Sequence, residues 1–168
     1  PIDFNDYIVM ITKKTSVLIA SSMKMGGIIN ELESSELDIL YDIGLKLGVA
    51  FQIQDDYLDL FGEEKIIGKK VGQDVVNNKK TALHHLFINT ASQIQLSKYN
   101  DYININSDDE KIDKIKSLFI ESEVAKSLKK IIQGYSNNAS TAIESLNPKF
   151  SKTSNLILLS EFLLKRTY

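Results

Sequence analysis

Three carboxylates stand close together at Asp55, Asp56 and Asp59, after the apolar run of residues 43–50. On a helix, Asp55 and Asp59 would share one face, with Gln52 one turn earlier on it. No lysine or arginine lies within four residues of these carboxylates, so the like charges would repel one another. Hard divalent cations bind carboxylate oxygens and would relieve that repulsion. The alternative is an acidic helical turn that is simply exposed to solvent.

The segment that follows, residues 62–81, is rich in glycine and lysine. Its glycines are Gly62, Gly68 and Gly72, and its lysines are Lys65, Lys69, Lys70, Lys79 and Lys80. Glycine lets the backbone approach a ligand closely, and lysine supplies positive charge. An acidic helix end followed by such a segment suits a phosphate group that Mg²⁺ bridges to the carboxylates and that lysine holds on its other side. A charged loop exposed to solvent is again the alternative.

The elements that must position these residues are all predicted to be helices. Apolar residues recur at helical spacing, strand-like alternation is absent, and the chain has only two prolines. We expect loops over residues 62–81 and 99–106, and a capping box at Ser107 and Glu110. Gly44 and Gly48, four residues apart, predict a close helix–helix contact. The helices are expected over about residues 3–30, from Ser34 or Ser35 to 61–62, over 80–97, from 108 onward, over 122–146 and over 153–165.

Composition excludes several classes of protein. The 168 residues carry a net charge of −2, which gives no electrostatic case for nucleic acid or an anionic membrane as partner. The absence of cysteine excludes disulfides and thiolate metal sites and fits a cytoplasmic protein. Polar or charged residues interrupt every apolar run, so no membrane span is expected.

Taken together, these motifs resemble those of trans-isoprenyl diphosphate synthases, the polyprenyl synthetase family, of the farnesyl and geranylgeranyl diphosphate synthase type. Residues 51–59, FQIQDDYLD, resemble the second aspartate-rich motif of that family. Residues 68–81 resemble its G-K-x-x-G-x-D-x-x-x-x-K-x-T segment, and residues 7–19 resemble a helix with a Lys–Thr pair. The resemblance is close from Asp6 to Thr81 and looser as far as the basic end at residues 164–166.

The resemblance implies an all-α helical bundle of the isoprenoid synthase type and a Mg²⁺-dependent enzyme, with Mn²⁺ as a possible substitute. Such an enzyme condenses an allylic diphosphate head-to-tail with isopentenyl diphosphate, and a homodimer is expected. The metal ligands would be Asp55, Asp56 and Asp59, the substrate-binding residues Lys14, Thr15, Phe51, Gln52, Lys69 and Lys79, and the catalytic residues Lys14, Thr15, Gln52 and Asp55.

Several of these assignments have a structural alternative. Lys14 could extend along an apolar helix face, Gln52 could be a buried amide, and Phe51 could belong to the core. Asp74 is expected to orient the lysines of the loop rather than to bind metal, and Lys80 to be solvated. The adjacent pair His84 and His85 has no partner at ligand spacing, which favours a structural role. 

One feature of the family has no counterpart in these 168 residues, namely a first aspartate-rich motif followed by two arginines. We therefore interpret residues 1–168 as the carboxy-terminal part, about half, of a single synthase domain. We expect this part to be inactive by itself and to leave an apolar face uncovered. The alternatives are a non-catalytic subunit of a heteromeric prenyl synthase and a helical interaction domain. Product chain length cannot be predicted, because in this family it depends on residues just before the first motif.

Overall fold

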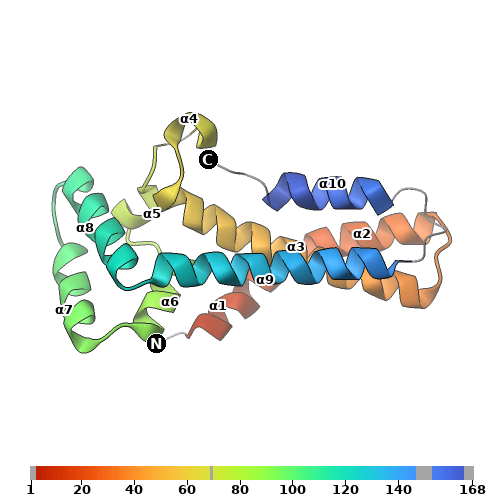
Figure 1. The fold of residues 1–168 in the computed structure, drawn as a ribbon, viewed down its shortest axis with the longest axis horizontal. Coiled ribbons are helices and arrows are strands. Elements are labelled where there is room, and N and C mark those ends of the chain that lie inside the picture. Colours follow the sequence, from red (N-terminus) through yellow and green to blue (C-terminus); the bar gives the residue numbers. More distant parts are fainter. Residues whose placement is uncertain (1–2, 69, 147–152, 165–168) are drawn as a thin grey trace. The chain divides into compact units, whose positions relative to one another are not determined.

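All the regular elements of residues 3–68, 70–146 and 153–164, which the computed structural model describes, are helices (Figure 1). None of the helices in these ranges is both long enough and apolar enough to cross a membrane. The prediction of an all-α fold is confirmed. In chain order the helices are α1 (Phe4–Ile11), the π-helical turn η1 (Thr12–Ser16), α2 (Val17–Ile29), α3 (Ser34–Phe61), α4 (Glu64–Ile67), α5 (Gln73–Val76), α6 (Ala82–Thr90), α7 (Gln93–Tyr102), α8 (Asp108–Glu121), α9 (Val124–Ser145) and α10 (Thr153–Leu164).

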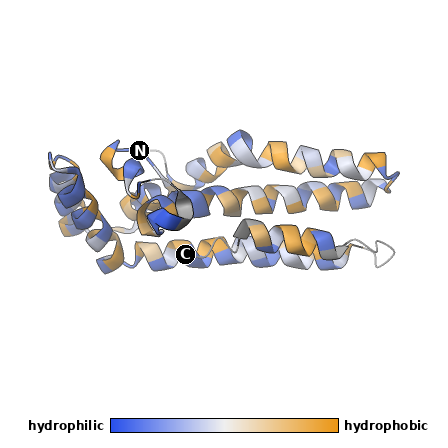
Figure 2. Cartoon of the chain, turned by 90° about the horizontal axis from the view of Figure 1, so that it is seen from above, coloured by the Kyte–Doolittle hydropathy of each residue, from blue (hydrophilic) through white to orange (hydrophobic). Residues whose placement is uncertain are grey.

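The chain divides into two compact units. The described part of the first unit comprises residues 3–7, 53–68 and 70–130, and that of the second comprises residues 8–52, 131–146 and 153–164. The division falls within α1, α3 and α9, so each of these helices contributes residues to both units. In Figure 2, hydrophobic residues in orange alternate with hydrophilic residues in blue along the long helices, which is typical of helices that bury one face.

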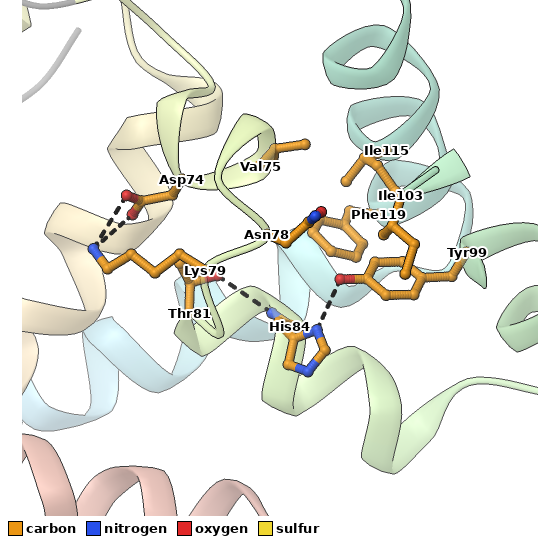
Figure 3. Close-up of a pocket in the computed structure, with 10 residues that line it drawn as sticks. All are labelled: Asp74, Val75, Asn78, Lys79, Thr81, His84, Tyr99, Ile103, Ile115 and Phe119. Carbon is orange, nitrogen blue, oxygen red and sulfur yellow. Dashed lines mark hydrogen bonds and ion pairs between the residues drawn. The ribbon is translucent and has the colours of Figure 1, made fainter. Parts of the chain in front are cut away.

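An aromatic cluster forms part of the core of the first unit. The rings of Phe87 in α6, Tyr99 in α7 and Phe119 in α8 pack with centroids 5.2–6.1 Å apart. Ile115, one turn before Phe119, is buried and lines the same small cavity as Tyr99 and Phe119 (Figure 3). Rings at these separations add to the free energy gained by burial, and here they hold three consecutive helices together.

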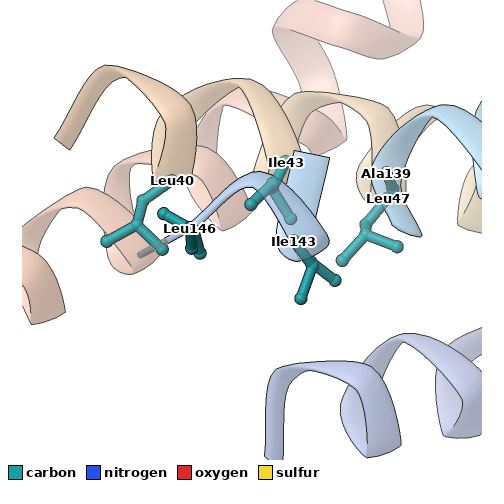
Figure 4. Packing of buried hydrophobic residues seen from close by; sticks show 6 residues of the cluster. All are labelled: Leu40, Ile43, Leu47, Ala139, Ile143 and Leu146. Atoms are coloured by element: carbon teal, nitrogen blue, oxygen red, sulfur yellow. The ribbon is translucent and has the colours of Figure 1, made fainter. Parts of the chain in front are cut away.

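The core of the second unit is a seam between α3 and α9 (Figure 4). Its residues recur at intervals of three and four along the chain, so each helix presents one apolar stripe to the other. Every one of these side chains is at most 7% exposed. The buried residues of the seam are Leu40, Ile43, Leu47, Ala139, Ile143 and Leu146.

Two glycines of α3 bring the backbones of two helical segments into contact. A Cβ atom on Gly44 would lie 2.4 Å from Ala20 Cα in α2, and one on Gly48 would lie 2.5 Å from Ser16 Cα in η1. Real Cβ contacts are never so short, so only glycine allows this approach. The close helix contact predicted at Gly44 and Gly48 is confirmed.

Part of the apolar surface of the second unit stays uncovered, as the sequence predicted. Leu18 and Ile29 of α2 are 72% and 81% exposed, and Met25 and Ile28 are also exposed. On a helix, residues 18, 25 and 29 share one face, so these side chains form a stripe rather than isolated contacts with solvent.

The predicted helix over residues 80–97 is wrong, because the chain turns at Ala91 and Ser92 and forms two helices. Ser92 accepts a hydrogen bond from Gln95 N (3.3 Å), and the Gln95 side chain accepts one from Ser92 N (2.9 Å). This capping box satisfies two backbone donors and starts α7 anew. Because α7 then runs to Tyr102, the first part of the loop predicted over residues 99–106 is helical.

Other predicted boundaries also differ from the structure. The segment 62–81 contains the short helices α4 and α5, and the first long helix is interrupted by the π-helical turn η1. Helix α9 begins at Val124, after Glu123 takes a left-handed conformation with φ of 58°. Ser107 does cap α8, by accepting a hydrogen bond from Glu110 N at 3.5 Å.

Candidate functional site

In the second unit, the Lys14–Thr15 pair lies in the π-helical turn η1 rather than in a regular α-helix. Such a turn carries one extra residue and is common at functional sites. The Thr15 hydroxyl donates a hydrogen bond to Gln52 Oε1 in α3, at 3.0 Å. The close approach at Gly48 brings η1 within reach of α3, so two residues 37 positions apart in sequence meet. Lys14 is exposed, and Phe51 is half-buried.

In the first unit, the three aspartates at the end of α3 have different surroundings. Asp56 and Asp59 are only 3% and 2% exposed, whereas Asp55 is partly exposed. Asp56 Oδ2 accepts a hydrogen bond from the Tyr7 hydroxyl (2.6 Å) and another from Ala82 N (2.8 Å). Its carboxylate therefore connects α3 to Tyr7 of α1 and to the first residue of α6.

Asp59 binds the segment between the two lysine groups of the loop. Its Oδ2 accepts a hydrogen bond from Asp74 N at 2.8 Å, and its backbone carbonyl accepts one from Gly72 N at 2.5 Å. From the sequence, Asp55, Asp56 and Asp59 are all expected to be metal ligands, and Asp55 alone is also expected to be catalytic. The structure gives Asp56 and Asp59 protein donors and leaves Asp55 as the most exposed of the three.

The aromatic residues of the same motif have a packing role. The rings of Tyr57 and Phe61 stack with centroids 4.8 Å apart. The ammonium groups of Lys129 and Lys116 lie over them, at 5.2 and 5.6 Å from the respective ring centres. These cation–π contacts join α3 to α8 and to the first turns of α9.

Lys79 is held by Asp74, as the sequence predicted for this aspartate. The Lys79 ammonium lies 3.1 and 3.0 Å from the two carboxylate oxygens (Figure 3). Burial by itself would lower the pKa of Lys79, but the hydrogen bond and the charge of Asp74 outweigh it and raise that pKa. Lys80 is exposed, and Lys69 lies outside the described residues.

Burial raises the pKa of Asp56, although the hydrogen bonds from Tyr7 and Ala82 N act in the opposite direction. Burial also raises the pKa of Tyr7, and the neighbouring charge of Asp56 adds to the effect. Tyr7 is therefore a neutral hydroxyl that donates to Asp56 throughout the physiological pH range.

The glycines of the loop serve its backbone geometry. Gly68 and Gly72 have φ of 72° and 80°, which is the left-handed region that glycine enters at little cost. Gly68 ends α4, and Gly72 precedes α5. A Cβ on Gly72 would also lie 2.6 Å from the Ile112 side chain. Both positions thus need glycine for reasons of folding.

His84 and His85 take part in packing. His84 Nδ1 lies 2.8 Å from the Tyr99 hydroxyl, and burial together with the neighbouring His85 lowers the pKa of His84 to about 4. The His85 ring packs on Tyr7 with centroids 5.3 Å apart. The cavity beside His84 in Figure 3 measures about 20 Å³, which is enough for one water molecule but not for a substrate.

A divalent cation fits this donor set only if most of its ligands come from elsewhere. Within the described ranges, no three or more Asp, Glu, His or Cys side chains gather in a way that could hold a metal ion. Mg²⁺ commonly keeps several waters and binds one or two carboxylates together with substrate phosphates. A single accessible carboxylate at Asp55 is compatible with that arrangement.

The all-helical fold, with an aspartate-rich helix end and a lysine-bearing segment bound to it, is the fold of the helical isoprenoid synthases. The profile of the Polyprenyl synthetase family matches residues 1–121. The chain therefore belongs to the polyprenyl synthetase family.

Individual relatives match parts of the chain. A short chain isoprenyl diphosphate synthase of Methanothermobacter thermautotrophicus is 44% identical over 78 residues, which cover 46% of this chain and 24% of the relative. A farnesyl pyrophosphate synthase of Nezara viridula is 40% identical over 104 residues, which cover 61% of this chain and 24% of the relative.

Solved structures match over nearly the whole chain. A geranylgeranyl pyrophosphate synthase superposes with a TM-score of 0.87 at 33% identity, over 100% of this chain and 53% of the other. The geranylgeranyl pyrophosphate synthetase of Pyrococcus horikoshii gives a TM-score of 0.86 at 30% identity, over 98% of this chain and 50% of the other. The chain thus spans about half the length of the solved relatives.

Tyr7 is the main site residue that the sequence analysis did not single out. In the sequence it is only the first residue of the segment 7–19 that resembles a helix with a Lys–Thr pair, yet its hydroxyl binds Asp56. A buried tyrosine needs a partner for its hydroxyl group. The sequence does not say which of the many carboxylates that partner is.

Proposed function

We propose that this chain acts in a prenyltransferase that condenses an allylic diphosphate with isopentenyl diphosphate, with Mg²⁺ or Mn²⁺ as cofactor. One observation carries the proposal. At the end of α3, Asp55 is partly exposed while Asp56 and Asp59 bind the segment that carries Lys79. An accessible carboxylate and a lysine fixed by the same helix end suit a metal–diphosphate group. The names of the relatives support this chemistry.

Asp55 would be the direct ligand of the metal, with Asp56 and Asp59 in supporting positions. When bound, Mg²⁺ neutralises charge on the diphosphate leaving group as the carbon–oxygen bond breaks. Lys79 would add a hydrogen-bonding positive charge toward the same leaving group. Lys69, which is not among the described residues, would have the same role. Because Asp74 already orients Lys79, little reorganisation is needed when the diphosphate binds.

Thr15, Gln52 and Lys14 would act on the allylic part of the substrate. The Thr15 hydroxyl fixes the Gln52 amide, whose carbonyl dipole would stabilise positive charge on the reacting carbon. Lys14 would contact the allylic diphosphate, and Phe51 the isopentenyl chain. The double bond of isopentenyl diphosphate then attacks the allylic carbon, and released diphosphate takes the proton, so no protein base is required.

The proposal includes a homodimer in the cytoplasm. We also expect residues 1–168 by themselves to give no prenyl transfer. Their single aspartate-rich motif would supply metal ligands from one direction, whereas a cluster of Mg²⁺ ions needs ligands from several.

The test is to assay the intact protein with dimethylallyl and isopentenyl diphosphates, with and without Mg²⁺, beside the variants Asp55→Asn and Lys80→Ala. We expect Mg²⁺-dependent product from wild type and Lys80→Ala and almost none from Asp55→Asn. Product only after an active synthase is added would favour a non-catalytic subunit. No product and no binding of inorganic diphosphate with Mg²⁺ would favour a helical interaction domain and refute the proposal.

A further inference from the structure

We propose that Tyr7, Asp56 and Asp59 are positioning residues rather than metal ligands, and that they hold the segment from Gly72 to Ala82 so that Lys79 is in place for diphosphate. The inference rests on the proposed function and assigns different tasks to three carboxylates of one motif. Its basis is the set of hydrogen bonds that Asp56 and Asp59 accept.

Asp59 serves as the N-terminal cap of α5, although it lies on another helix. The first backbone N–H groups of a helix have no partner within it, and Gly72, which precedes α5, has no side chain to offer. Asp59 Oδ2 accepts from Asp74 N in the first turn of α5, and Asp59 O accepts from Gly72 N. A helix of four residues is not stable alone, so this contact determines where it forms.

Asp56 serves α6 in the same way. Its Oδ2 accepts from Ala82 N, the first residue of α6, while Thr81 Oγ1 accepts from His84 N at 3.4 Å. Two donors of this helix start are thus satisfied, one by a local cap and one by a distant aspartate. A negative carboxylate at this end also interacts favourably with the helix dipole.

The hydrogen bond from Tyr7 offsets part of the free-energy cost of burying the Asp56 carboxylate, and Tyr7 itself is buried. Its side chain is 2% exposed, and its hydroxyl lies 2.6 Å from the oxygen that also accepts from Ala82 N. A hydroxyl–carboxylate hydrogen bond of this length is charge-assisted and strong. A metal ion on the same oxygen would have to displace at least one of these donors.

The two anchoring residues, Asp56 and Asp59, both act on Lys79. Asp59 fixes Asp74, whose carboxylate holds the Lys79 ammonium, and Asp56 fixes Ala82, three residues after Lys79. The lysine therefore lies between two points that are tied to the same end of α3. Loss of either anchor should reduce diphosphate binding through Lys79 without removing a metal ligand.

The experiment measures two quantities by calorimetry on the intact protein. The first is the affinity for inorganic diphosphate in the presence of a chelator, which reports the lysines. The second is the gain in that affinity when Mn²⁺ is present, which reports the metal ligands. We expect Asp55→Asn to keep the diphosphate affinity in chelator and to abolish the gain with Mn²⁺. We expect Tyr7→Phe to lower the affinity in chelator by about 3- to 10-fold, the usual effect of one hydrogen bond, and to keep the gain with Mn²⁺.

Asp59 offers a pair of variants that separates anchoring from metal binding. Asparagine keeps a carbonyl oxygen that can accept from Asp74 N, but it is a poor replacement for a metal-binding carboxylate. Asp59→Asn should therefore preserve both the diphosphate affinity in chelator and the gain with Mn²⁺. Asp59→Ala should lower the affinity in chelator. If Asp59→Asn abolishes the Mn²⁺ gain as Asp55→Asn does, Asp59 is a metal ligand and the proposal falls.

Coupling to Lys79 is tested with a double variant. In a Lys79→Ala background, Tyr7→Phe should cause no further loss of the diphosphate affinity measured in chelator, because the residue through which it acts is gone. An equal loss in both backgrounds would overturn the proposed route. Tyr99→Phe is the matched control, since it removes the hydroxyl of a mostly buried tyrosine from His84 and should leave affinity unchanged.

Amide hydrogen exchange distinguishes failure of this inference from failure of the proposed function. Tyr7→Phe should speed exchange at Ala82 N, and Asp59→Ala at Asp74 N, in the absence of any ligand. Unchanged exchange would refute the anchoring. If exchange changes as expected but Asp55→Asn leaves the Mn²⁺ gain intact, the anchoring stands and the assigned metal site is wrong.

Discussion

Replacement of Gly48 by alanine should force apart the two helical segments that bring Thr15 to Gln52. The new Cβ would lie 2.5 Å from Ser16 Cα and 2.7 Å from Ser16 Cβ. Carbon atoms pack best at about 3.5–4.0 Å, so a separation of at least about 1 Å must be created. The obstacle is backbone, which cannot rotate away as the tip of a long side chain could.

The size of the effect follows from two opposing contributions. Overpacking of this kind costs about 1–3 kcal/mol, and alanine in place of glycine within a helix contributes about 0.5–1 kcal/mol. We therefore expect Gly48→Ala to lower the free energy of unfolding by about 1–2 kcal/mol. For a chain of this size that corresponds to a fall in Tm of about 2–8 °C. Because the Thr15–Gln52 hydrogen bond lies next to the displaced turn, kcat should fall as well.

The measurement is thermal and urea unfolding, followed by far-ultraviolet circular dichroism. Gly26→Ala in α2 and Gly134→Ala in α9 are matched controls, because a Cβ at either position meets no atom within 4 Å. Each control should keep or slightly raise the stability, by at most about 1 kcal/mol. If Gly48→Ala proves as stable as Gly26→Ala, the two backbones are not in contact and the reasoning is refuted.

Three further predictions concern charged and titratable groups. Asp55→Asn should lower turnover by about two to four orders of magnitude, and a variant that keeps more than about half of the activity at saturating Mg²⁺ would exclude its role as metal ligand. Lys79→Ala should raise the KM for a diphosphate substrate by about 10-fold while Lys80→Ala changes it little, and the reverse result in steady-state kinetics would show that the wrong lysine was chosen. His84 has a pKa of about 4 in the folded protein against about 6.5 when unfolded, so its contribution to stability is present above pH 6.5 and is lost as the pH falls toward 4. Urea unfolding should show a loss of up to about 3 kcal/mol over that range, and a His84→Gln variant with the same pH dependence would contradict it.

Local sequence was sufficient where short-range spacing governs the structure. Helical periodicity predicts the long helices, and the pair Gly44 and Gly48 predicts a backbone contact, because four residues make one helical turn. Asp74 and Lys79 are five residues apart, and their ion pair could also be anticipated. The motifs at residues 51–59 and 68–81 indicate the family, which the match over residues 1–121 confirms.

Short elements were harder to predict, because their stability comes from distant partners or from one competing hydrogen bond. Helix α5 depends on Asp59, and residues 73–76 alone carry no helix signal that a periodicity analysis would detect. The break before α7 depends on the capping box of Ser92 and Gln95, which outweighs a helical pattern that continues across it. 

The sequence by itself determined which residue types are available for chemistry: carboxylates on one helix end, lysines after them, and a Lys–Thr pair upstream. Only the tertiary structure decided that Asp55 remains partly exposed while Asp56 and Asp59 turn to protein donors. The physical reason is that helical spacing specifies the face on which a carboxylate lies but not what covers that face. Tyr7, 49 residues from Asp56 in sequence, supplies part of the cover, and no local pattern encodes that contact.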